Sequence, residues 1–147
     1  DYRCGYCRKA HDEVQSLVDT DGKIRLIMKE FPILGEESVA ASRFAISVQQ
    51  IAGADPYKRV HDRLIAFKGN MTEEALTRIA TEEGLDAPAI LARMNAPEVN
   101  AVIAANHSLA GRLQINGTPT FVLENSLLRG YLPLESLTKL VADARLK

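Results

Sequence analysis

The chain has 147 residues, of which 46% are hydrophobic and 25% are charged, and its formal net charge is −1. This composition is typical of one globular domain with a hydrophobic core. The near-neutral charge excludes the basic footprint of a nucleic-acid-binding protein, and no polybasic run predicts attachment to a membrane surface. No apolar stretch is long enough to span a bilayer, and no signal segment is visible.

The first expected helix covers residues 4–19, where apolar side chains recur at helical spacing. A turn at residues 19–22 follows. Residues 23–31 predict a strand that ends at Pro32, because the apolar residues Ile24, Leu26 and Met28 stand at every second position. From residue 36 to residue 112 the pattern predicts only helices.

The last part of the chain predicts a hairpin and a helix. Residues 120–123 and 127–131 favour two strands, and the final helix begins at Pro133. We therefore expect a single α/β domain over residues 1–147, in which helices cover both faces of one mixed sheet. A strand ending just before Cys4 would complete this thin sheet, so we expect the N-terminal strand to be truncated in this sequence.

The chain contains only two cysteines, Cys4 and Cys7, separated by Gly5 and Tyr6 at the start of the first helix. Thiols at this spacing convert between dithiol and disulfide at little geometric cost, and the helix N-terminus favours the thiolate of Cys4. A structural disulfide here would close too small a loop to constrain the unfolded chain. The pair therefore predicts a redox-active site.

A zinc- or copper-binding module is the alternative interpretation. Cys4, Cys7 and His11 have suitable ligand types, and His61 or His107 could supply a fourth ligand. A closed structural zinc site needs four ligands and the chain has no second Cys-x-x-Cys, so this alternative ranks second. Otherwise His11 is predicted to be a surface or capping residue, with His61 and His107 solvated.

Residues 1–7, together with the Gly-Thr-Pro-Thr-Phe-Val run of residues 117–122, resemble the DsbA-like branch of the thioredoxin-fold disulfide oxidoreductases. The resemblance covers nearly the whole chain. Residues 34–115 resemble the helical insertion that this branch carries between the central strand and the cis-proline strand. The resemblance thus implies a thioredoxin-like fold.

The resemblance also implies roles for individual residues. Cys4 would be the exposed nucleophile and Cys7 the buried resolving cysteine. Pro119 would be a cis-proline that faces the disulfide, with Thr118 before it, and the adjacent backbone would pair with a substrate peptide. Glu30 is the candidate for a buried acid that shuttles the proton of the resolving cysteine.

The implied activity is thiol–disulfide exchange on thiol- or disulfide-containing protein substrates, without an organic cofactor or a nucleic-acid partner. The resemblance further implies a periplasmic or otherwise exported location and a membrane redox partner that recycles the active site. Gly5 and Tyr6 stand where the strongest oxidases of the family carry Pro-His, which predicts a less oxidising pair. A threonine before the cis-proline, as at Thr118, is found in the disulfide isomerases as much as in the oxidases of the family. The resemblance therefore implies either an oxidase or an isomerase.

Overall fold

The computed structural model describes residues 1–147 and shows a mostly helical protein with one small sheet. Helix α1 (Gly5–Asp21) begins after Cys4 and ends at Gly22, whose φ of 69° is the left-handed conformation that glycine adopts without strain. The expected first helix is therefore confirmed, close to its predicted bounds.

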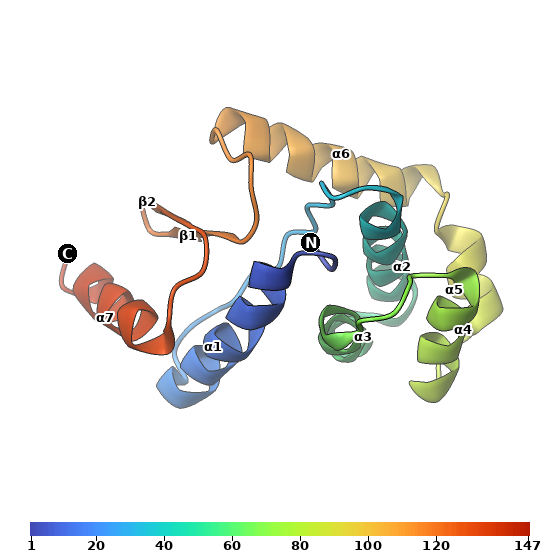
Figure 1. Ribbon diagram of the computed structural model, residues 1–147, viewed down its shortest axis with the longest axis horizontal. Coiled ribbons are helices and arrows are strands. Elements are labelled where there is room, and N and C mark those ends of the chain that lie inside the picture. The colour runs from blue at the N-terminus through green and yellow to red at the C-terminus, as the bar shows by residue number, and fades with distance from the viewer.

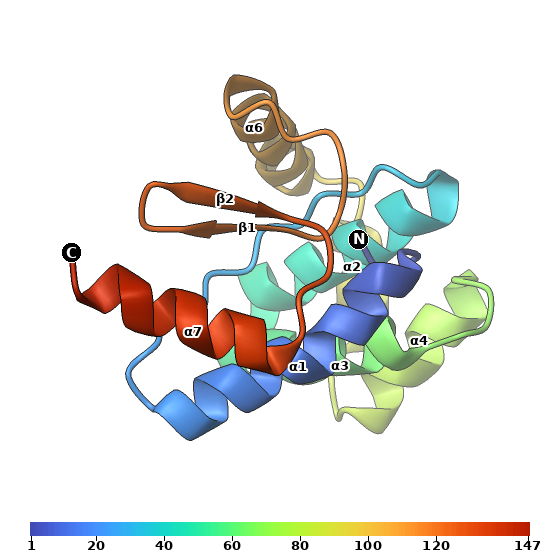
Figure 2. The same cartoon turned by 60° about the vertical axis from the view of Figure 1, so that its left-hand side comes forward.

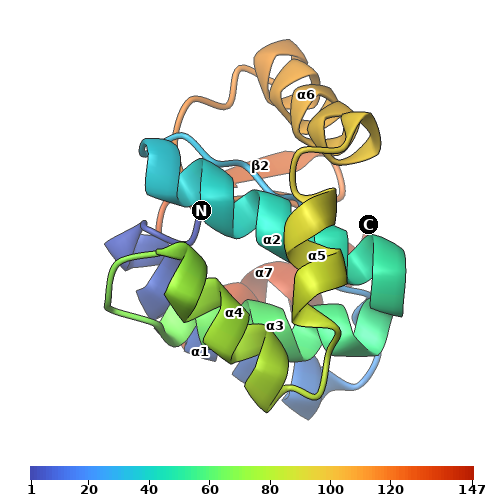
Figure 3. The same ribbon diagram turned by 90° about the vertical axis from the view of Figure 1, so that its right-hand side faces the viewer.

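Four helices follow and form one side of the molecule: α2 (Glu36–Ala52), α3 (Ala54–Ala66), α4 (Glu73–Glu82) and α5 (Ala87–Arg93) (Figures 1 and 3). The largest hydrophobic cluster of the protein lies among them and includes Phe44, Val48, Val60, Leu64, Leu76 and Ile90.

Side-chain caps fix the starts of the two shorter helices in this group. The Thr72 hydroxyl accepts a hydrogen bond from the Ala75 amide, and the Asp86 carboxylate accepts one from the Ala89 amide. Such caps satisfy amides that have no partner within the helix.

Of the remaining elements, α6 (Pro97–Arg112) lies over α2, whereas the hairpin and α7 (Leu134–Arg145) lie away from the helical group (Figure 1). Helix α6 crosses the end of α2 and leads to the antiparallel hairpin of β1 (Thr120–Leu123) and β2 (Ser126–Arg129). Helix α7 packs against α1 beneath this hairpin (Figure 2). The predicted hairpin is confirmed, although β2 ends before the expected residue 131. Gly130 turns the chain towards α7 with a φ of 86°.

The strand expected over residues 23–31 is not formed. Residues 23–33 are irregular and lead from α1 back to α2, and no backbone hydrogen bond joins them to another segment. Their alternating pattern predicts extended backbone, but a strand also needs a hydrogen-bonded neighbour, which the pattern does not specify. Leu26, Ile27 and Met28 remain 40%, 60% and 40% exposed. The only sheet is therefore the two-stranded hairpin rather than the expected mixed sheet.

None of the seven helices combines the length and the apolarity that crossing a lipid bilayer requires.

Candidate active site

Cys4 occupies the N-cap of α1, so its sulfur lies beside the unpaired amides of the first helical turn. The backbone N–H of Cys7 donates a hydrogen bond to the Cys4 Sγ over 3.1 Å. On its other side, the Cys4 Sγ lies 3.4 Å from the carbonyl oxygen of Thr118 and donates to it. The Cys-x-x-Cys spacing explains the hydrogen bond between the Cys7 amide and the Cys4 sulfur, because an N-cap side chain accepts a hydrogen bond from the amide three residues later.

The two thiols differ in how readily they ionise. Burial would raise the pKa of Cys4, but hydrogen bonds from the Cys7 thiol, from the Thr118 side chain and from the Cys7 amide outweigh it, so this pKa lies below its ordinary value. Burial raises the pKa of Cys7 to about 11, and its hydrogen bond to Cys4 acts in the same direction. The thiolate of the reduced pair therefore forms on Cys4.

The exposure of the two cysteines differs from the expected exposed nucleophile and buried partner. Both are free thiols, but Cys4 is 6% exposed whereas Cys7 is half-buried. Cys4 is covered because the Thr118 carbonyl and the first turn of α1 lie on either side of its sulfur. As a whole residue, Cys4 is therefore less exposed than Cys7 in the reduced protein, which differs from the expectation.

The loop before β1 brings the predicted proline motif to the cysteine pair. The Thr118–Pro119 peptide bond is cis, as the resemblance implies. The Pro119 carbonyl accepts a hydrogen bond from the Gly130 amide over 2.8 Å, which joins this loop to the end of β2. Two segments 114 positions apart in the sequence thus meet at the sulfur of Cys4.

The two residues between the cysteines face solvent. Tyr6 is 66% exposed, and a β-carbon placed on Gly5 would meet no atom within 4 Å. Neither residue contributes to the core, and both positions are accessible from solvent.

Glu30 lies in a buried polar cluster rather than at the dithiol. One of its carboxylate oxygens accepts hydrogen bonds from the hydroxyls of Tyr2 and Tyr57, over 2.6 and 2.7 Å, and the other accepts one from Ser42 over 2.8 Å. Glu30 is only 7% exposed, and these donors offset the free-energy cost of burying its carboxylate. No hydrogen bond joins Glu30 to Cys7, so the structure does not bring the expected proton-shuttle residue into contact with that thiol.

His61 is buried, at 7% exposure, which corrects the expectation that it is solvated. Its Nδ1 lies 2.9 Å from the Tyr2 hydroxyl. Burial, and then the neighbouring His11, lower the pKa of His61 to about 4, so its ring is neutral at physiological pH. The helical spacing carried this signal, because His61 follows the core residue Tyr57 by four positions and precedes Leu64 by three.

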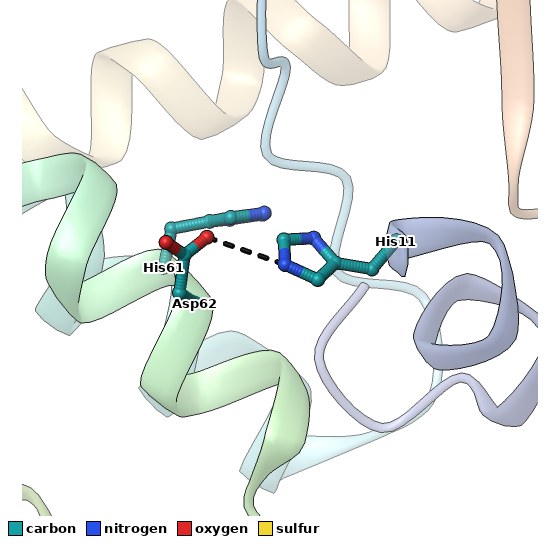
Figure 4. A group of neighbouring side chains, drawn as sticks. All are labelled: His11, His61 and Asp62. Carbon is teal, nitrogen blue, oxygen red and sulfur yellow. Dashed lines mark ion pairs between the residues drawn. The ribbon is translucent and has the colours of Figure 1, made fainter. Parts of the chain in front are cut away.

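The alternative metal site of Cys4, Cys7 and His11 is not assembled. His11 points towards α3, where its Nε2 lies 3.3 Å from Oδ1 of Asp62 and its ring lies beside His61 (Figure 4). The ligand atoms of these three α1 and α3 residues lie within 4.8 Å of one another, whereas no such group includes either cysteine. His107 stays exposed on α6 and packs against a phenylalanine ring.

The polar partners of Glu30 are not among the site residues expected from the sequence. Besides the hydroxyl donors, the side-chain amide of Asn106 donates to the Glu30 carbonyl over 2.8 Å. Ser42 and Asn106 carried a usable signal, because each is a polar residue on the buried face of a helix and such residues need a buried partner. Tyr2 carried none, since it precedes the first helix.

A Cys-x-x-Cys dithiol at the start of a helix is typical of thioredoxin-like thiol–disulfide oxidoreductases. The sequence profile of the DSBA-like thioredoxin domain family matches residues 1–142, so the chain belongs to this family. It has a thioredoxin-like fold and is a DsbA-like thiol–disulfide oxidoreductase.

Solved structures agree with this assignment. A thioredoxin-like oxidoreductase from Silicibacter pomeroyi DSS-3 is 43% identical, with a TM-score of 0.92 over 100% of this chain and 83% of that chain. The thiol-disulfide exchange protein alpha-DsbA2 from Wolbachia pipientis is 29% identical, with a TM-score of 0.90 over 97% of this chain and 77% of that chain. The catalytic domain of Proteus mirabilis ScsC, at 23% identity, shares the fold with a TM-score of 0.87 over 100% of this chain and 80% of that chain. The comparison with curated proteins found no match.

Proposed function

We propose that the protein exchanges disulfides with protein substrates, as an oxidase or an isomerase, with Cys4 as the nucleophile and Cys7 as the resolving cysteine. The observation that carries this proposal is the difference between the two thiols. The pKa of Cys4 is lowered by its hydrogen bonds, whereas burial raises that of Cys7 to about 11. Because the thiolate is the attacking species, exchange begins at Cys4.

In the oxidase direction, a substrate thiolate attacks the Cys4 sulfur of the oxidised pair. The Cys4–Cys7 bond breaks, and Cys7 leaves with the electron pair and takes up a proton. A second substrate thiolate then attacks the substrate sulfur of the mixed disulfide, and Cys4 departs as a thiolate. Two electrons have moved from the substrate to the pair, and the low pKa of Cys4 makes it the better leaving group.

In the isomerase direction, the Cys4 thiolate attacks a substrate disulfide and releases one substrate thiolate. That thiolate, or another in the substrate, attacks a different sulfur until Cys4 is released again, so no net electron transfer occurs. If the substrate stays attached, Cys7 attacks Cys4 and reduces the substrate.

The residues around the pair support roles in substrate contact. Thr118 lies against the Cys4 sulfur, and Pro119 has no N–H, so we assign to this loop the contact with the substrate backbone. The exposed ring of Tyr6 lies in the same first turn and is assigned to the substrate side chains. No proton transfer is assigned to Glu30, because three hydroxyl donors occupy its carboxylate.

We further propose a periplasmic or otherwise exported location, where disulfides persist, and a membrane redox partner that restores the active site after each cycle. Membership of the DsbA-like family supports both proposals. One structural neighbour at 22% identity, from Salmonella enterica serovar Typhimurium, is described as a periplasmic thioredoxin-like protein.

The test measures exchange and direction together. Wild-type protein and the variants Cys4→Ser and Cys7→Ser are incubated with reduced or scrambled ribonuclease A, with circular dichroism as the check on folding. We expect Cys4→Ser to abolish turnover and Cys7→Ser to accumulate a mixed disulfide. Full turnover by folded Cys4→Ser would contradict the assignment.

The redox equilibrium with glutathione then separates the two directions. A potential near about −120 mV indicates an oxidase, whereas a value of about −180 mV or lower indicates an isomerase or a reductase.

A further inference from the structure

Three metal-ligating side chains meet between α1 and α3, away from the dithiol. His11 comes from α1, whereas His61 and Asp62 come from α3, and Figure 4 shows them pointing towards one another. Their ligand atoms lie within 4.8 Å of one another. Two imidazoles and one carboxylate are a donor set that zinc accepts, usually with water in the fourth position.

One ligand pair already has the required separation. The Nε2 of His11 lies 3.3 Å from Oδ1 of Asp62. Two ligands bonded at about 2.0–2.1 Å to a tetrahedral zinc ion lie about 3.4 Å apart. An ion could therefore enter between these two atoms without moving either helix.

The buried cluster behind His61 orients its ring for metal binding. Glu30 accepts hydrogen bonds from three hydroxyls, which is the pattern of an ionised carboxylate. The Tyr2 hydroxyl therefore gives its hydrogen to Glu30, and its oxygen accepts one from Nδ1 of His61, 2.9 Å away. This tautomer leaves the lone pair on Nε2 of His61, and no hydrogen bond to a protein group occupies that nitrogen. Such a hydrogen bond behind a metal-binding histidine is the usual arrangement in metal sites.

The site is open to solvent, and one cation competes for it. The side chains of His11 and Asp62 are 19% and 40% exposed, which gives an ion a path of entry. Lys58 contacts both carboxylate oxygens of Asp62, over 2.7 and 2.6 Å. The Lys58 side chain is itself 43% exposed, so it can release one oxygen and remain solvated.

We propose that His11, His61 and Asp62 bind Zn²⁺ or a chemically similar divalent transition-metal ion, which joins the redox helix α1 to α3. Each imidazole contributes Nε2 and Asp62 contributes one oxygen. This site is distinct from the dithiol, and the proposal does not depend on the direction or substrates of thiol exchange.

The experiment uses a Cys4→Ser/Cys7→Ser chain, so that no thiol can bind metal. Zn²⁺ is titrated in competition with a chromophoric chelator, and we expect one ion per chain. His11→Ala and His61→Gln should each weaken binding by at least about tenfold, because each removes one of the three protein ligands. His107→Ala, an exposed histidine on α6, is the matched control and should change nothing.

Two further variants distinguish a metal site from an ordinary polar cluster. Lys58→Met should tighten Zn²⁺ binding, since it removes the competing cation from Asp62. Tyr2→Phe should weaken binding by roughly 10–100-fold, since it removes the acceptor that orients His61.

Absence of stoichiometric binding, or binding that survives both histidine substitutions, would overturn the proposal. If His61→Gln does not fold, the half-buried His11→Ala variant decides alone. Bound Zn²⁺ should also raise the thermal unfolding temperature of the Cys4→Ser/Cys7→Ser chain, and it should not do so when His11→Ala is added.

Discussion

At the scale of single residues, Cys4 and Cys7 differ chemically because they occupy different positions on one helical turn. At the N-cap, the sulfur of Cys4 accepts a hydrogen bond from the Cys7 amide. Cys7 lies one turn into the helix, where burial desolvates its thiol and no backbone amide donates to it. The N-cap position therefore determines which cysteine forms the thiolate, even though Cys4 is the more buried residue. At Cys4, hydrogen bonds lower the thiol pKa by more than burial raises it.

The first prediction concerns the order of thiol alkylation. Reduced protein treated with iodoacetamide at increasing pH should react first at Cys4, with a midpoint below the usual value of about 8.5, because its thiolate is stabilised. Cys7→Ser should retain this early reaction. Cys4→Ser should leave a thiol that reacts only at higher pH. Mass spectrometry of the alkylated peptides identifies the site, and earlier alkylation of Cys7 would contradict the assignment.

The second prediction concerns Tyr6, which is 66% exposed and can be replaced without loss of core packing. Tyr6→His places a protonatable ring beside the thiolate and should lower the pKa of Cys4 by about one unit, as a nearby opposite charge does. One pKa unit stabilises the reduced form by at most about 1.4 kcal/mol, a limit reached only above the pKa of Cys4, so the pair becomes at most about 30 mV more oxidising. The glutathione equilibrium measures this shift. Tyr6→Phe is the control, and an equal shift in both variants would rule out the charge effect.

At the scale of elements, the Glu30 cluster connects parts of the chain that share no regular sheet. Its hydroxyl donors come from the N-terminal segment through Tyr2, from α2 through Ser42 and from α3 through Tyr57. Glu30 itself belongs to the irregular segment between α1 and α2. Buried hydrogen bonds thus hold that segment in place where strand pairing does not.

The third prediction follows from this cluster. Glu30→Gln keeps the shape but replaces charge-assisted hydrogen bonds by weaker ones and leaves an amide donor without a partner. We expect a loss of about 1–3 kcal/mol in the free energy of unfolding. Urea denaturation measures it, with Glu74→Gln on the exposed face of α4 as the matched control. Equal stability of the two variants would show that the cluster does not hold the segment.

The sequence predicted elements whose signals are local. The first helix and the hairpin depend on residues within a few positions of one another, and both are present. The strand expected over residues 23–31 failed because its existence depends on a distant partner. The prediction that His61 is solvated failed for a related reason, since its burial depends on the helices packed around α3.

The candidate site shows the same limit. The Cys4–Cys7 contact could be predicted from N-cap geometry alone, because both residues lie in one turn. The contact between Cys4 and Thr118 spans 114 positions, and only the family resemblance indicated it. The cluster of His11, His61 and Asp62 had no sequence signal, because it depends on the packing of α1 against α3.

At the scale of the whole molecule, α1 lies between two groups of elements. It packs against α3 of the helical group on one side and against α7 on the other. Its N-terminus lies against the loop before β1, so the Cys4 sulfur contacts both α1 and the hairpin half of the chain. The ionisation of this one thiol is therefore linked to the folding of the entire domain.

The fourth prediction is the pH dependence of the stability of the reduced protein. The folded state lowers the pKa of Cys4, so it loses that proton before the unfolded state does, and stability rises with pH up to the unfolded value of about 8.5. The folded state raises the pKa of Cys7 to about 11, so it keeps a proton that the unfolded state releases, and stability falls at higher pH. We expect this fall to be at most about 2 kcal/mol, since Cys7 is half-buried.

Urea denaturation under reducing conditions measures this dependence for the wild type and for Cys4→Ser/Cys7→Ser. Subtracting the variant from the wild type removes the contributions of all other titrating groups, which the two chains share. The difference should rise from neutral pH, reach a maximum between about pH 8 and 9, and then decline, because the unfolded thiols titrate there. A difference that falls steadily from neutral pH would mean that burial of the Cys4 sulfur outweighs its hydrogen bonds, and the thiolate would then have to be assigned elsewhere.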